Sequence, residues 1–83
     1  MSLKRMQNME QEADLLNVRI MQIKPADEDY LYYVLCHSKS EKQYITWLYN
    51  DDMGGFHAGH YFNYFNRNRE DVYKQALDDF NKR

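Results

Sequence analysis

The connections between four strand-like segments of this chain are too short to contain a helix, and this limits the possible folds more than any other feature. Aromatic and β-branched side chains are frequent in residues 18–24, 30–37, 42–49 and 56–64, as is typical of β-strands. The stretches between them contain Pro25, a Ser-Lys-Ser-Glu sequence and two adjacent glycines, which favour turns. Since a crossover between parallel strands needs about a dozen residues or more, the sequence predicts an antiparallel meander.

A helix is predicted at each end of the chain. Residues 3–16 have one apolar stripe at helical spacing, and Asn17 is expected to end that helix. Asn68 is expected to cap the last helix. The stripe of the first helix consists of Leu3, Met6, Met9, Ala13 and Leu16, and that of the last of Val72, Tyr73, Ala76, Leu77 and Phe80.

The predicted fold class is therefore α+β, a single domain over residues 1–83 in the order α-β-β-β-β-α. The sheet has four strands, or three if the segment 56–64 does not form a strand. Gly59 lies in the middle of that segment, where it indicates a β-bulge.

The register that short hairpins favour sorts the strand residues onto two faces. It pairs Leu35 with Tyr44, Tyr33 with Thr46, and Tyr44 with Tyr61. The first face holds Trp47 and Phe56, the second holds Tyr33, Tyr44 and Tyr61, and neither is clearly polar. Two arrangements follow: both helices cover the first face, or one helix covers each face and both faces are core.

In the first arrangement the second face is an exposed apolar surface larger than monomers normally show. Tyrosine suits an interface, because it combines a large contact area with a hydroxyl group. The sequence therefore predicts a small protein-interaction module that forms a homodimer or larger homo-oligomer, or binds another protein. Single-stranded nucleic-acid binding through the same tyrosines is the alternative. The candidate interface consists of Leu31, Tyr33, Leu35, Tyr44, Leu48 and Tyr61.

Charge is expected to be separated along the strands. The formal net charge is −2, which disfavours duplex nucleic acid as a partner. In a meander the first and third strand connections lie at one end of the sheet, and both are acidic. One end is predicted to gather Asp27, Glu28, Asp29, Asp51 and Asp52, and the other Lys39, Lys42, Arg67 and Arg69.

No residue pattern predicts a catalytic, cofactor-binding or metal site, so the chain is expected not to be an enzyme. His57 and His60 are three residues apart, which on a strand points their rings to opposite faces. Cys36 and His37 are adjacent and also point apart, so Cys36 is interpreted as a small buried apolar residue. A single cysteine and the lack of any long apolar run predict a cytoplasmic protein with no membrane partner.

Overall fold

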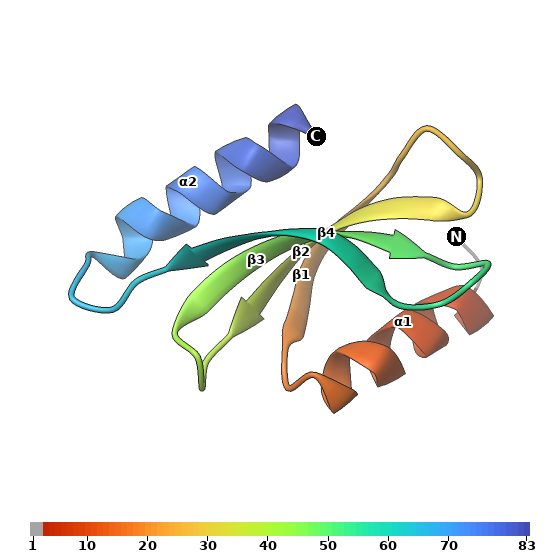
Figure 1. Ribbon diagram of the computed structural model, residues 1–83, viewed down its shortest axis with the longest axis horizontal. Coiled ribbons are helices and arrows are strands. Elements are labelled where there is room, and N and C mark those ends of the chain that lie inside the picture. The colour runs from red at the N-terminus through yellow and green to blue at the C-terminus, as the bar shows by residue number, and fades with distance from the viewer. Residues whose placement is uncertain (1–2) are drawn as a thin grey trace.

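The computed structural model describes the backbone of residues 3–83 and the side chains of residues 7–83. Four antiparallel strands form one sheet in the order β1-β2-β3-β4, and a helix stands at each end of the chain (Figure 1). The predicted α+β fold is confirmed, including the fourth strand. The elements are α1 (Leu3–Leu15), β1 (Arg19–Pro25), β2 (Leu31–Ser38), β3 (Gln43–Asn50), β4 (Phe56–Asn63) and α2 (Arg69–Lys82).

Local signals end α1 where the sequence predicts. Asn17 adopts a left-handed φ of 59°. The Asn17 N–H donates to the Asp14 carbonyl and the Val18 N–H to the Ala13 carbonyl, each at 3.0 Å, which is a Schellman motif. Met9 and Ala13 of the predicted stripe are buried, whereas the side chains of Leu3 and Met6 lie outside the described residues. Leu16 is 53% exposed, because the helix ends one residue before it.

The start of α2 also follows the prediction. The Asn68 side chain accepts a hydrogen bond of 3.0 Å from the Asp71 N–H, so it satisfies one of the free donors of the first turn. The predicted apolar face is confirmed, because Val72, Ala76 and Phe80 are buried against the sheet.

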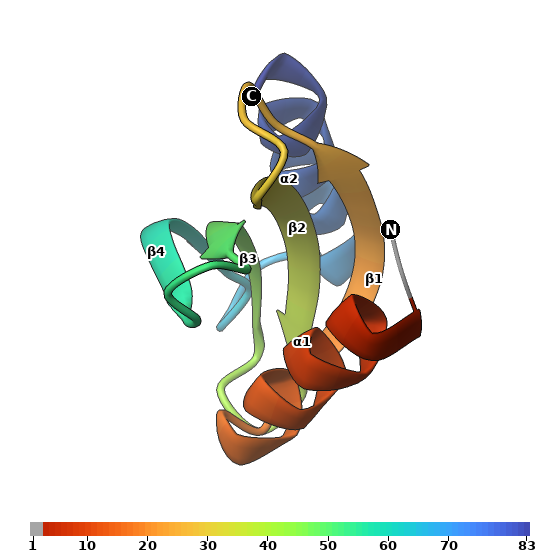
Figure 2. The ribbon, with the colours of Figure 1, turned by 90° about the vertical axis from the view of Figure 1, so that its right-hand side faces the viewer.

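The two helices lie on opposite sides of the sheet (Figures 1 and 2), so the second of the two predicted arrangements holds. Tyr49 helps to hold α1 on the first face, because its hydroxyl donates a hydrogen bond to the Glu12 carboxylate. The first face packs Val18, Tyr32, Val34, Cys36, Ile45, Trp47 and Tyr49 against Met9 and Ala13 of α1. The second face packs Leu35 and Tyr44 against Val72, Ala76 and Phe80 of α2.

The β2–β3 hairpin differs in register from the prediction but keeps its faces. Leu35 faces Thr46, where Tyr44 was expected. The loop lies one residue later than predicted, because Lys42 adopts a left-handed φ of 51° and belongs to the turn. A shift of one residue on each strand moves the pairing by two residues in total, so each side chain stays on its predicted face.

Both outer strands contain a β-bulge. In β1 the extra residue is Met21, which moves Ile23 onto the first face, beside the α1 cluster. In β4 the register shifts between His57 and His60, and Ala58 has a left-handed φ of 51°. The bulge expected near Gly59 is therefore present.

The β4 bulge moves Tyr61 to the other side of the sheet. Tyr44 faces Phe62 rather than Tyr61, so Phe62 takes the predicted place of Tyr61 on the second face. Tyr61 instead stands at the edge of the first face, where its hydroxyl accepts a hydrogen bond of 3.3 Å from the Trp47 indole. The indole covers the backbone of Gly59 so closely that an added Cβ would lie 2.4 Å from the Trp47 Nε1 atom.

A polar network fixes the last turn of α2 on the second face. The buried Thr46 hydroxyl donates to the Asp79 carboxylate at 2.5 Å, and the His60 Nδ1 atom lies 2.9 Å from the same carboxylate. Arg83 donates to the carbonyl and hydroxyl oxygens of Thr46. Partial burial raises the pKa of Asp79, but the hydrogen bonds from Thr46 and His60 and the charges of His60 and Arg83 outweigh it. The pKa of Asp79 therefore lies below its ordinary value.

We expect Gly59→Ala to lower the free energy of unfolding by about 1–3 kcal/mol, because the new methyl group displaces the indole of Trp47. Ala58→Gly is the matched control at the neighbouring position. This substitution removes the strain of a left-handed φ at an alanine, but it also increases the conformational entropy of the unfolded chain. The free energy of unfolding should therefore stay unchanged or rise by up to about 1 kcal/mol. Urea denaturation followed by tryptophan fluorescence measures both. Equal stabilities would contradict the packing of Trp47 on Gly59.

We expect the free energy of unfolding to fall as the pH drops below about 4. A carboxyl group whose folded pKa is lowered contributes stability above its ordinary pKa of 3.8, and this is lost as the pH falls through the folded value. Asp79→Asn should cost about 1–3 kcal/mol at neutral pH and show a shallower acid decline. Asp78→Asn, which removes only an exposed pairing with Lys82, is the control. The measurement is urea denaturation at a series of pH values, and an unchanged slope in Asp79→Asn would contradict this account.

Candidate anion-binding pocket

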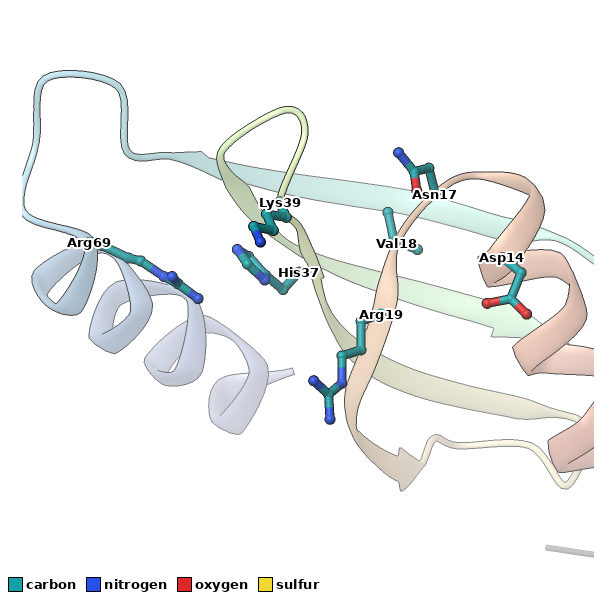
Figure 3. A pocket seen from close by; sticks show the side chains of 7 residues that line it. All are labelled: Asp14, Asn17, Val18, Arg19, His37, Lys39 and Arg69. Atoms are coloured by element: carbon teal, nitrogen blue, oxygen red, sulfur yellow. The ribbon is translucent and has the colours of Figure 1, made fainter.

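A pocket of about 430 Å³ lies where β1 and α2 begin and β2 ends. Four of its side chains carry or can acquire positive charge, and they come from β1, β2, the β2–β3 turn and α2. Figure 3 shows His37, Lys39 and Arg69 gathered on one side of the pocket, with Arg19 below them and Asp14 on the far side, on α1. The lining residues are Asp14, Asn17, Val18, Arg19, His37, Lys39 and Arg69.

Strand register and helix placement bring these cations together. Arg19 faces His37 across the β1–β2 ladder, so both side chains are on the second face of the sheet. Lys39 follows in the β2–β3 turn. Because α2 covers the second face and begins at Arg69, the side chain of Arg69 lies beside His37 and Lys39 in the pocket (Figure 3).

The rings of Tyr44 and Tyr64 pack against two of the residues that line the pocket. The imidazole of His37 stacks on Tyr44 with ring centroids 4.7 Å apart, and its Nε2 atom lies 2.9 Å from the Tyr64 hydroxyl. The Arg69 Nε–H donates to the Tyr44 hydroxyl at 2.8 Å, and its guanidinium lies over the rings of Tyr44 and Tyr64. His37 and Arg69 are therefore held in position before any ligand arrives.

Positive charge dominates the pocket. Partial burial lowers the pKa of His37 first, and the charges of Arg69, Arg19 and Lys39 lower it further. Of the carboxylates that the structure describes, none forms an ion pair with these three cations. An arrangement of this kind attracts an anion. A bound anion reduces the repulsion among the cations and lowers the free-energy cost of protonating His37 beside them.

A second cavity of about 370 Å³ adjoins the first and shares Arg19, His37 and Arg69 with it. It continues along β1 past Ile20 to Met21, whose side chain is 41% exposed. The charged pocket therefore opens onto a partly apolar surface at the edge of the sheet.

The predicted interface is not one exposed surface, and that prediction needs correction. Leu35 and Tyr44 are buried beneath α2, with exposed fractions of 0% and 3%. Tyr61 is exposed but lies on the first face, because of the β4 bulge. The remaining three residues, Leu31, Tyr33 and Leu48, are half-buried on the second face.

The sequence identified most of the pocket's cations but not the pocket. Lys39 and Arg69 belong to the predicted basic end, whereas Arg19 is not part of that prediction. The sequence places His37 only beside Cys36, and its position at the centre of the cations depends on its pairing with Arg19. The alternation of strand side chains is the signal that places both residues on one face.

Other chemistry-bearing residues are accounted for by packing. No metal-binding group of histidine, cysteine and carboxylate side chains occurs within the described residues. Cys36 is buried in the first-face core, where burial raises the pKa of its thiol to about 12. It packs as a small apolar residue, as the sequence predicts.

No known protein family, curated protein or solved structure matches this chain. Over the residues that the structure describes, neither helix has the length and apolar character needed to cross a membrane.

We expect the pKa of His37, measured by NMR titration, to lie below its ordinary value of 6.5 and to rise in Arg19→Gln. The unfolded chain takes up a proton near pH 6.5 and the folded protein only at lower pH. His37 therefore makes the fold lose stability as the pH falls below 6.5. Arg67→Gln removes a cation that does not line the pocket and should leave this pKa almost unchanged. Equal shifts in both variants would contradict a local effect of Arg19.

Proposed function

We propose that the protein is a small protein-interaction module that binds an acidic segment of a partner protein at the basic end of its sheet. The basic end comprises Arg19, Lys39, Lys42, Arg67 and Arg69. The observation that carries the proposal is the cluster of three cations around His37 at an open pocket, in which tyrosine rings hold His37 and Arg69 in place. The proposal is one of binding rather than catalysis.

Charge separation along the strands supports this choice of surface. Two hydrogen bonds join segments at the basic end. The Tyr64 N–H donates to the Lys42 carbonyl, and the Asn17 side-chain amide donates to the Ser40 hydroxyl. At the opposite end, the Asp51 N–H donates to the Tyr30 carbonyl and brings two acidic loops together. A protein with a net charge of only −2 thus gathers five basic side chains at one end of the sheet, where they can steer and orient an acidic partner.

Single-stranded nucleic acid is the second candidate ligand. Phe65 favours it, since its ring is 50% exposed at the basic end and lies beside the ammonium group of Lys42. The tyrosines offer less, because Tyr44 is buried and Tyr64 is half-buried beneath Arg69. With so little open ring surface for base stacking, an acidic polypeptide fits the basic end better.

A second copy of the chain is one source of an acidic segment. The acidic end carries Asp27, Glu28, Asp29, Asp51 and Asp52, and it is complementary in charge to the basic end. Self-association of this kind predicts a sedimentation coefficient that rises with protein concentration at low salt and falls to the monomer value at high salt. A monomer at every concentration would leave a different protein as the partner.

A cytoplasmic location suits the single reduced thiol of Cys36.

We expect a fluorescently labelled glutamate-rich peptide to bind in a salt-dependent manner, measured by fluorescence anisotropy. The double variant Lys39→Glu/Arg67→Glu should lower the affinity by about tenfold or more, because it reverses two charges of the binding surface. Lys82→Glu, at the far end of α2, is the control and should have little effect.

A neutral peptide and a single-stranded oligothymidylate complete the test. Tighter binding of the oligonucleotide than of the acidic peptide would support nucleic acid as the ligand instead. If neither binds at low salt, the basic end is not a binding surface.

A further inference from the structure

We infer that the pocket between Arg19, His37, Lys39 and Arg69 binds one phosphate group, carried by a phosphorylated side chain of the partner protein. This inference rests on the proposed function and specifies the chemistry of the acidic segment.

The charge of the pocket matches a phosphate group better than a carboxylate. Its lining includes three permanent cations, Arg19, Lys39 and Arg69, and one carboxylate, Asp14. Three positive charges less one negative charge leave a net charge of +2. A phosphorylated side chain carries about −1.5 to −2 at neutral pH, whereas a glutamate carries a single negative charge.

The donors also suit a phosphate group. The Arg69 Nε–H is used by Tyr44, which orients the guanidinium and leaves its two terminal nitrogens for a ligand. Among the residues that the structure describes, none forms a hydrogen bond or ion pair with the guanidinium of Arg19. Two guanidinium groups from different elements and one ammonium group can together satisfy the three oxygens of a phosphate group.

The ligand is larger than free phosphate, because the pocket is not a closed cage. Its volume of about 430 Å³ far exceeds one phosphate group, and the adjoining cavity leads to Ile20 and Met21. A polypeptide with an apolar residue beside the phosphorylated residue fills both cavities. This is why a phosphorylated side chain is favoured over inorganic phosphate.

Binding of a phosphate group should change the pKa of His37. The groups that face it are Arg19 from β1, Lys39 from the turn, Arg69 from α2, and the hydroxyl-bearing rings of Tyr44 and Tyr64. A bound phosphate group offsets the cations, so the pKa of His37 should rise when the site is occupied. This rise is expected even where no other residue moves.

The test uses three short peptides of the same neutral sequence, with phosphoserine, glutamate or serine at one position and leucine next to it. Binding is followed by NMR titration of the isotope-labelled full chain. We expect the phosphoserine peptide to bind about tenfold or more tightly than the glutamate peptide, to perturb Arg19, His37 and Arg69, and to raise the pKa of His37. Inorganic phosphate should perturb the same residues but bind more weakly, because it does not reach Met21.

Arg19→Gln and Lys39→Gln should each lower the affinity for the phosphoserine peptide by about tenfold, the loss expected for a charge-assisted hydrogen bond. Arg67→Gln makes the same change of charge at the same end of the molecule but outside the pocket, and it should have a much smaller effect. The NMR spectra of the free variants report whether each is folded. Arg19 and Lys39 are exposed, so both folds should persist.

The outcomes separate this inference from the proposed function. Equal affinity for the phosphoserine and glutamate peptides, or equal losses in Arg19→Gln and Arg67→Gln, would overturn the phosphate site and leave an acidic-segment module standing. Inorganic phosphate that binds as tightly as the phosphopeptide would overturn the assignment to a partner's side chain. If no acidic peptide binds to the folded protein, both proposals fail.

Discussion

A sheet that is apolar on both faces must be covered on both, and the other features of this protein depend on that requirement. The strands bury Val34 and Ile45 on one face and Leu35 and Tyr44 on the other. Neither face could remain in water without exposing more apolar surface than a soluble monomer normally shows. A helix from each end of the chain meets this requirement, and the short loops of the meander leave only those two segments to do so.

The second helix does more than cover the sheet, because its position assembles the charged pocket. The buried contacts of Val72 and Phe80 fix the axis of α2, and the network around Asp79 fixes its last turn. Its first residue, Arg69, therefore lies beside Arg19 of β1 and His37 of β2, in the same pocket. The core residues of α2 thus set the spacing between cations that belong to elements far apart in the sequence.

Features that depend on neighbouring residues could be predicted from the sequence. The left-handed Asn17 and the Asn68 cap each rest on the conformational preference of a residue within its own turn. Features that depend on distant contacts could not. The apolar stripe of a helix does not tell which face of a sheet it covers, so Tyr44 could be assigned to either a core or an interface. One extra residue in β4 was enough to move Tyr61 across the sheet.

The two bulges also bear on the solubility of the protein. An open sheet ends in two strands whose outward backbone groups are free to pair with another chain, which is a common route to aggregation. Here both outer strands are interrupted, β1 at Met21 and β4 at Ala58, and each bulge bends the strand and breaks the even row of donors and acceptors. A second sheet therefore finds no regular edge to extend. If the proposed partner binds through side chains at the basic end, the strands themselves offer no template for fibril growth.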